Sequence, residues 1–199
     1  MIERDSWVIV VAQMAELFEV DVVFGTYDDS SSPNALASPS TTLLKKRDGT
    51  LPKDGSVMFG RSYLQIIRQL PNATTAMTAV CAHEFGHILQ YKNDFALDEL
   101  VSFFLKENTK IRAELHADFV CGYYGAVRKR VQRRYPAEIQ ALTEFNSGDP
   151  EGAALNHGTP EQRGKAVNNG FLLGSDGNTY SPREIVAKGM DYVRALSLH

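Results

Sequence analysis

The chain has 199 residues, a formal net charge of −3 and an ordinary balance of 43% hydrophobic and 23% charged residues. A chain of this length can bury one sizeable core, so we expect a single domain over residues 1–199. The slightly negative charge gives no electrostatic case for nucleic-acid binding. No run reaches the roughly 18–20 apolar residues of a membrane span, and the start lacks the apolar core of a signal peptide. We therefore expect a cytoplasmic protein without a membrane span.

The first third of the chain is patterned as a helix, a small sheet and a second helix. Apolar residues recur at three- and four-residue steps in the first segment, and runs of strand formers separated by turn residues follow it. We expect helices at 3–19 and 61–70, strands at 21–27 and 56–59, a further short strand at 41–44, and an exposed loop at 45–55. Residues 34–38 fit a strand and a plain loop equally well.

The remainder is patterned as helices. Expected helices lie at 74–91, 97–105, 110–133, 136–145, 159–169 and 181–195. Thr159 and Gln162 have the spacing of a capping box, with Pro160 at the first helical position. The fold class is therefore α+β and mostly helical. The two cysteines, Cys81 and Cys121, form no disulfide framework, and we expect reduced thiols in buried helices.

The helix expected at 74–91 contains the pattern H-E-x-x-H, formed by His83, Glu84 and His87. Residues four apart lie on one helix face, so both imidazoles can reach a single Zn²⁺ at about 2.0–2.1 Å. Glu84 projects about 100° further round the helix, close to the metal without being a ligand. A general base that takes a proton from water needs that position.

A second pair of candidate residues, Glu114 and Asp118, shares one face of the helix expected at 110–133. Glu114 can supply the third ligand of a zinc site that keeps one position open. Asp118 can accept a hydrogen bond from the far nitrogen of a ligand histidine. The alternative is an ordinary pair of solvated acids, but the neighbouring residues are apolar or small. We expect one Zn²⁺ per chain, with His116 facing away from it and a ligand role for Cys121 left open.

HEFGH at 83–87 followed by E-x-x-A-D at 114–118 resembles the gluzincin metallopeptidases. Residues 156–163, NHGTPEQR, are similar to the H-G-[ST]-x-x-Q-R segment of the bacterial putative neutral zinc metallopeptidases. They also resemble the [ST]-H-P-x-x-x-x-R segment of the heat-shock and CAAX-processing membrane zinc proteases, and residues 32–37 resemble the N-A-F-A strand of that group. The resemblance implies a zincin-like fold with a small N-terminal sheet whose edge strand borders the active-site cleft.

The resemblance also implies where a substrate binds. A peptide would lie along the edge strand by β-addition, which would make substrate-binding residues of Asn34, Ala35, Leu36 and Ala37. The segment at 156–163 would fold back to the active site. His157 or Arg163 could then donate to the oxyanion, or orient Asp118 or the bound peptide. A purely structural role for His157 stays open, and Tyr91 is a weaker candidate donor.

These expectations combine into a zinc-dependent metalloendopeptidase with Glu84 as general base, acting on a protein or peptide substrate. The endopeptidase choice follows from the lack of any feature that captures a chain terminus. The alternative is a catalytically silent or latent zinc-binding regulatory or interaction protein on the same fold. A basic run at 128–134 is typical of a solvated helix end, with docking of an acidic protein partner as the second interpretation.

Overall fold

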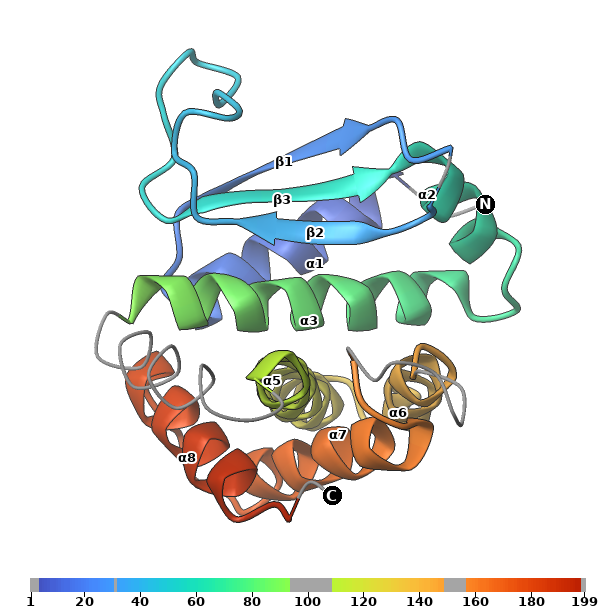
Figure 1. Ribbon diagram of the computed structural model, residues 1–199, viewed down its shortest axis with the longest axis vertical. Coiled ribbons are helices and arrows are strands. Elements are labelled where there is room, and N and C mark those ends of the chain that lie inside the picture. Colours follow the sequence, from blue (N-terminus) through green and yellow to red (C-terminus); the bar gives the residue numbers. More distant parts are fainter. Residues whose placement is uncertain (1–3, 31, 94–108, 149–156, 198–199) are drawn as a thin grey trace.

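The computed structural model describes residues 4–30, 32–93, 109–148 and 157–197 (Figure 1). Within these ranges the chain is α+β, with helices in the majority, as the sequence predicts. The elements in chain order are α1 (Arg4–Leu17), β1 (Val22–Tyr27), β2 (Ala35–Ser38), β3 (Gly55–Gly60), α2 (Arg61–Arg68), α3 (Ala73–Lys92), α5 (Thr109–Val131), α6 (Ala137–Asn146), α7 (Pro160–Gly174) and α8 (Pro182–Arg194). No helix among the described residues is long and apolar enough to cross a membrane.

The sheet has three strands in the order β1-β3-β2. The first strand pairs with β3 in parallel, and β2 pairs with β3 in antiparallel orientation. Residues 34–38 therefore contribute a strand at an edge of this sheet, which decides between the two interpretations of that segment. The carboxylate of Asp29 connects the start of β2 to the first turn of α2. It accepts hydrogen bonds from the backbone N–H groups of Asn34, Ser62 and Tyr63.

Helix α3 runs between the two halves of the molecule. Figure 1 shows the sheet on one side of this helix and α5, α6, α7 and α8 on the other. Its residues from Thr75 to Gly86 are all buried, which explains why apolar and small side chains occupy every face of it. Gly86 is required for this packing, because a Cβ there would lie 2.7 Å from the Cα of Ala117 in α5. The close approach brings the middle of α5 against the helix that carries the two motif histidines.

Helices α5 and α7 approach each other even more closely. A Cβ on Gly122 would lie 1.8 Å from the carbonyl oxygen of Val167, and one on Gly170 would lie 1.8 Å from that of Phe119. Only glycine allows this approach. The start of α7 is fixed by the capping box between Thr159 and Gln162, which forms as the sequence predicts. The first turn of α7 carries Arg163, which is buried.

One predicted strand is wrong. Residues 41–44 form bends rather than a strand. Pro39 follows β2 directly and has no backbone N–H to continue the ladder. The side chain of Leu44 instead packs against the backbone of β1, since a Cβ on Gly25 would lie 2.5 Å from Leu44 Cδ1. The helix predicted at 97–105 lies outside the described residues.

Candidate metal centre

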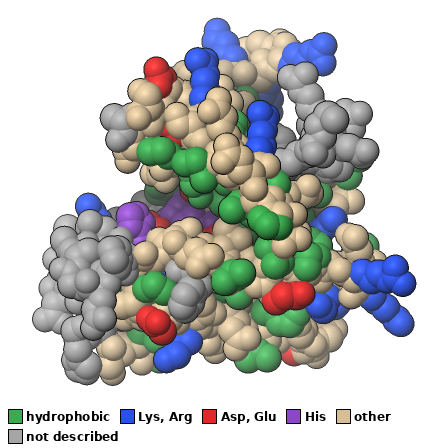
Figure 2. Space-filling view, turned by 90° about the vertical axis from the view of Figure 1, so that its right-hand side faces the viewer, with side chains coloured by type: hydrophobic (Ala, Val, Ile, Leu, Met, Phe, Trp, Pro, Cys, Tyr) green, Lys and Arg blue, Asp and Glu red, His purple; other side chains and the backbone are tan. Residues whose placement is uncertain are grey.

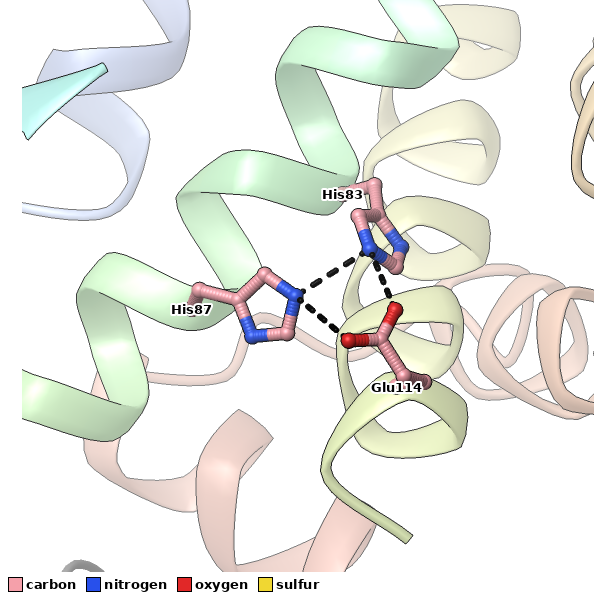
Figure 3. Close-up of side chains that lie close together, drawn as sticks. All are labelled: His83, His87 and Glu114. Carbon is pink, nitrogen blue, oxygen red and sulfur yellow. Dashed lines mark hydrogen bonds and ion pairs between the residues drawn. The ribbon is translucent and has the colours of Figure 1, made fainter. Parts of the chain in front are cut away.

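Three side chains converge between α3 and α5. Figure 3 shows His83 and His87 projecting from one helix toward Glu114 on the other. The two Nε2 atoms of the histidines lie 3.1 Å apart. Glu114 Oε2 lies 3.2 Å from His83 Nε2, and Glu114 Oε1 lies 3.6 Å from His87 Nε2. The sequence-predicted ligand set is therefore brought together as one group that could hold a metal ion.

The far nitrogen of His83 faces a buried carboxylate, because Asp118 Oδ1 lies 2.8 Å from His83 Nδ1. Arg163 Nη2 also lies 3.3 Å from Nδ1. Its two hydrogens have nearer acceptors, namely Asp118 Oδ1 at 2.7 Å and Glu144 Oε2 at 2.9 Å. His83 Nδ1–H therefore donates to Asp118, which leaves the lone pair on Nε2 facing the ligand group.

The guanidinium of Arg163 lies within a second group of side chains that could bind a metal ion. His83, Asp118 and Glu144 form a further group of potential ligands. Arg163 fills it, with Nε donating to Asp118 Oδ2 at 2.8 Å and Nη1 donating to the Ser147 carbonyl at 3.2 Å. A cation already neutralises this group, so a second metal ion is not needed there. Arg163 thus contacts Asp118, which agrees with one of the three roles considered for it.

The donor set at the first group fits zinc. A tetrahedral zinc ion with bonds of about 2.0–2.1 Å holds its ligand atoms about 3.3 Å apart, close to the spacings found here. Two imidazole lone pairs that face each other at 3.1 Å also repel unless a cation or a proton lies between them. Two imidazoles and one carboxylate form a ligand set of catalytic zinc sites, which keep a further position for water.

The charges of the ligand group are strongly coupled. Burial lowers the pKa of His83, but hydrogen bonds to Asp118 and Glu114 outweigh burial and raise it well above its usual value. Burial raises the pKa of Glu114, but hydrogen bonds from His83 and His87 outweigh it and hold that pKa well below its usual value. The site thus favours an anionic carboxylate beside positive charge, as a metal site requires.

Glu84 lies beside this group in a different environment. The residue is 6% exposed, and its Oε2 is buried without a hydrogen-bond partner among the described residues. Burial is the main cause that raises the pKa of its carboxyl group. A buried polar atom without a partner costs free energy, and such atoms are often retained where they act on a ligand.

A cleft of about 460 Å³ opens over the metal group. The predicted substrate, ligand and catalytic residues share its wall, which is lined by Pro33, Asn34, Ala35, Leu36, Ala37, Tyr63, Val80, His83, Glu84, His87, Tyr91, Glu114, Glu144, Ser147, His157 and Arg163. Figure 2 shows histidine side chains in the hollow between the upper and lower parts of the molecule. Asp118 is fully buried behind His83, as its predicted supporting role requires.

Two expected non-ligands stay apart from the metal group. Cys121 Sγ lies 3.6 Å from the Ala79 carbonyl oxygen and accepts a contact from Gln140 Nε2 at 3.7 Å. His116 is buried and contacts Gln90 and Val186. Neither residue belongs to a group of potential metal ligands among the described residues.

Sequence reasoning missed Gln90 and Glu144. Gln90 lies three residues after His87, so helical spacing alone could have placed it near that imidazole. Its Oε1 lies 3.0 Å from His87 Nδ1. Glu144 reaches Arg163 only because α6 packs beside α7, and no local pattern in the sequence indicates that contact.

Comparisons with known proteins give no relative. No protein-family model, no curated protein and no solved structure matches this chain. Any functional assignment therefore rests on the motifs and on the geometry of this site.

Proposed function

We propose that this chain is a zinc-dependent metalloendopeptidase of zincin-like fold, in which His83, His87 and Glu114 hold one Zn²⁺. The observation that carries the proposal is a pairing of two features in one cleft. Three convergent ligands that fit zinc lie beside a buried carboxylate, Glu84, whose Oε2 has no partner among the described residues. A structural zinc site is usually closed by four ligands and has no use for such a base.

Each residue of the cleft has a separate role in the proposed hydrolysis. The zinc ion, when bound, polarises the scissile carbonyl and makes water acidic. Glu84 Oε2 takes one proton from the attacking water and passes it to the leaving amine nitrogen. Burial raises the pKa of the Glu84 carboxyl group, which makes the carboxylate a better proton acceptor for this step. Asp118, held by Arg163, keeps the proton of His83 on Nδ1.

The substrate in this proposal is an extended segment of a protein or peptide. Strand β2 lies at the sheet edge and lines the cleft, so its backbone groups can pair with such a segment. His157 and Tyr91 line the same cleft and are the candidate donors to the oxyanion. The guanidinium of Arg163 bonds Asp118, Glu144 and the Ser147 carbonyl, which supports a role in positioning Asp118 and not in donating to the oxyanion.

The basic end of α5 retains its two interpretations. Arg130 donates to the Asn178 carbonyl at 3.1 Å, and Arg128 donates to Gln13 at 2.7 Å. Both contacts are exposed and lie within the chain. They support the interpretation of the run as a solvated helix end over the interpretation as a docking site. Residues 133 and 134 are exposed and would carry the contact in a complex with an acidic protein.

The proposal is tested by turnover. Zinc-loaded wild type, Glu84→Gln and the surface control Glu16→Gln are incubated with unfolded casein, and new peptide termini are counted. We expect wild type and Glu16→Gln to cleave, and Glu84→Gln to lose about 10²–10⁴-fold in rate, as loss of a general base does.

Two results would contradict the proposal. Equal rates in wild type and Glu84→Gln would reject Glu84 as the base. Zinc binding without cleavage of casein or of a random peptide library would favour the alternative, a zinc-binding regulatory protein on this fold.

A further inference from the structure

We propose that Gln90 is a positioning residue that fixes the ring of His87, and that His116 of α5, itself bonded to α8, holds Gln90 in place. The inference rests on the proposed metal role of His87. It adds a second supporting chain to the site, independent of Asp118 and Arg163. Its members are buried or half-buried between α3, α5 and α8.

The orientation of the Gln90 amide is decided by a backbone carbonyl. The Ala113 oxygen lies 2.8 Å from one terminal atom of Gln90 and can only accept a hydrogen bond. That terminal atom must therefore be the amino group, Nε2. The other terminal atom, Oε1, then faces His87 Nδ1 at 3.0 Å and can only accept. The proton of His87 is consequently on Nδ1, and the Nε2 lone pair points at the ligand group.

His116 uses the remaining hydrogen of the amide. Its Nδ1 lies 3.1 Å from Gln90 Nε2, and since that amino group donates, Nδ1 is the acceptor. The proton of His116 is then on Nε2, which lies 3.1 Å from the Val186 carbonyl of α8 and donates to it. Each donor in this chain meets one acceptor, and a single tautomer of each imidazole satisfies all of them.

The position of His116 is itself fixed. The residue is fully buried, and a Cβ on Gly189 of α8 would lie 2.9 Å from its ring atoms. The ring therefore has no room to turn away from Gln90. Helix α8 in this way acts on the metal site although none of its residues lines the cleft.

Gln90 also joins the two helices that carry the ligands. Ala113 directly precedes Glu114 in α5, and His87 lies one turn before Gln90 in α3. One side chain thus sets the spacing between the third ligand and the second. The two ligand histidines are supported differently: His83 by a carboxylate paired with a guanidinium, and His87 by a neutral amide.

The first test measures the tautomer of His87 in the zinc-free protein. Histidine is labelled with ¹⁵N and the imidazole signals are recorded at alkaline pH, where His87 is neutral. We expect the Nδ1–H tautomer to dominate in wild type and a mixed population in Gln90→Met, whose side chain offers no acceptor to His87 Nδ1–H. This measurement needs no zinc, so it tests the inference even if the proposed enzyme fails.

The second test measures zinc affinity by competition with a chelator. Supporting hydrogen bonds to metal ligands are typically worth about 10–100-fold in affinity, and we expect a loss of that size in Gln90→Met. The matched control is Gln140→Met, which removes another buried glutamine amide that bonds Cys121 and not a ligand. We expect the control to bind zinc as wild type does.

The third test asks whether His116 acts through Gln90. His116→Leu should weaken zinc binding in the wild-type background and have no further effect in the Gln90→Met background, since coupled residues are not additive. Unchanged tautomer and affinity in Gln90→Met would overturn the inference. Equal zinc losses in Gln90→Met and Gln140→Met would also overturn it, because packing alone would then explain both.

Discussion

Two glutamates of the cleft have opposite environments. Hydrogen bonds from both histidines hold the pKa of Glu114 well below its usual value despite burial. Glu84 is buried with no partner for Oε2 among the described residues, and burial raises the pKa of its carboxyl group. Carboxylates whose environments separate their pKa values commonly take different roles in one site. The separation agrees with the proposed roles of Glu114 as a ligand and Glu84 as a base.

The buried carboxylate of Glu84 should cost stability. Replacing it by methionine keeps a similar volume and removes an oxygen, Oε2, that has no partner within the part of the chain that the structure describes. We expect Glu84→Met to raise the free energy of unfolding of the zinc-free protein by about 1–3 kcal/mol. Urea unfolding at neutral pH in the presence of a chelator measures it. A variant less stable than wild type would show that the carboxylate is satisfied in solution.

The buried imidazole of His116 should make the free energy of unfolding depend on pH. Burial penalises its charged form and lowers the pKa from 6.5 to about 4 in the folded protein. Between these values the unfolded chain binds more protons, so stability falls as pH drops from about 6.5 to 4. The contribution amounts to at most about 3 kcal/mol over that window.

The difference between variants isolates this contribution. Zinc-free His116→Leu should lose less stability than wild type across the same pH window, because both proteins share every other titrating group. The measurement is urea unfolding at several pH values. Parallel stability curves for the two proteins would show that His116 is not held neutral.

Every second residue of β2 directs its backbone N–H and C=O groups away from β3 and toward the cleft. The Asn34 carbonyl accepts from Gly60 N–H at 2.8 Å, so the chain faces β3 at this position. Bonding directions alternate along an antiparallel edge, so Leu36 also faces β3, whereas Ala35 and Ala37 direct their N–H and C=O groups outward. Both alanines line the cleft, where an extended peptide could pair with them.

This alternation yields a prediction for Ala37. Ala37→Pro removes one outward N–H without touching the ladder to β3, whereas Ala37→Val keeps it. We expect the proline variant to have about 2–10-fold lower kcat/KM for a peptide than the valine variant, the effect of one hydrogen bond. Zinc affinity should be equal in the two. Equal kcat/KM values would show that the substrate does not pair with this edge.

Local spacing explains which elements could be predicted from the sequence. The motif histidines, Glu114 and Asp118 are related by four-residue steps within single helices, so their shared faces follow from helix geometry alone. The distance between the two helices depends on Gly86 against Ala117, a tertiary contact. The place of Gln90 was within reach of the same helical spacing.

Other features depended on packing that no local pattern reveals. Glu144 joins Arg163 through the contact of α6 with α7, and the amide of Gln90 is oriented by a carbonyl of another helix. The strand predicted at 41–44 had the right residue types but follows a proline at the end of β2. Leu44 packs on β1 instead. Tertiary context overrides propensity in these segments.

At the scale of the whole molecule, the candidate metal site lies on α3, the helix between two layers. The sheet covers one side of α3 and the helical layer covers the other (Figure 1). His83 and Glu84 on this helix are largely removed from water. Electrostatic interactions are stronger in such surroundings than at a surface. The cleft still reaches the ligand group beside the edge strand β2, as the proposed function requires.

The most direct test of this account is the zinc content of the folded chain. Wild type, Glu84→Gln, His87→Ala and Glu114→Ala are equilibrated with Zn²⁺, freed of loosely bound metal and assayed by elemental analysis. We predict one zinc per chain in wild type and in Glu84→Gln, and much less in the two ligand variants. A wild type without zinc, or ligand variants that retain it fully, would contradict the metal centre on which the proposed peptidase depends.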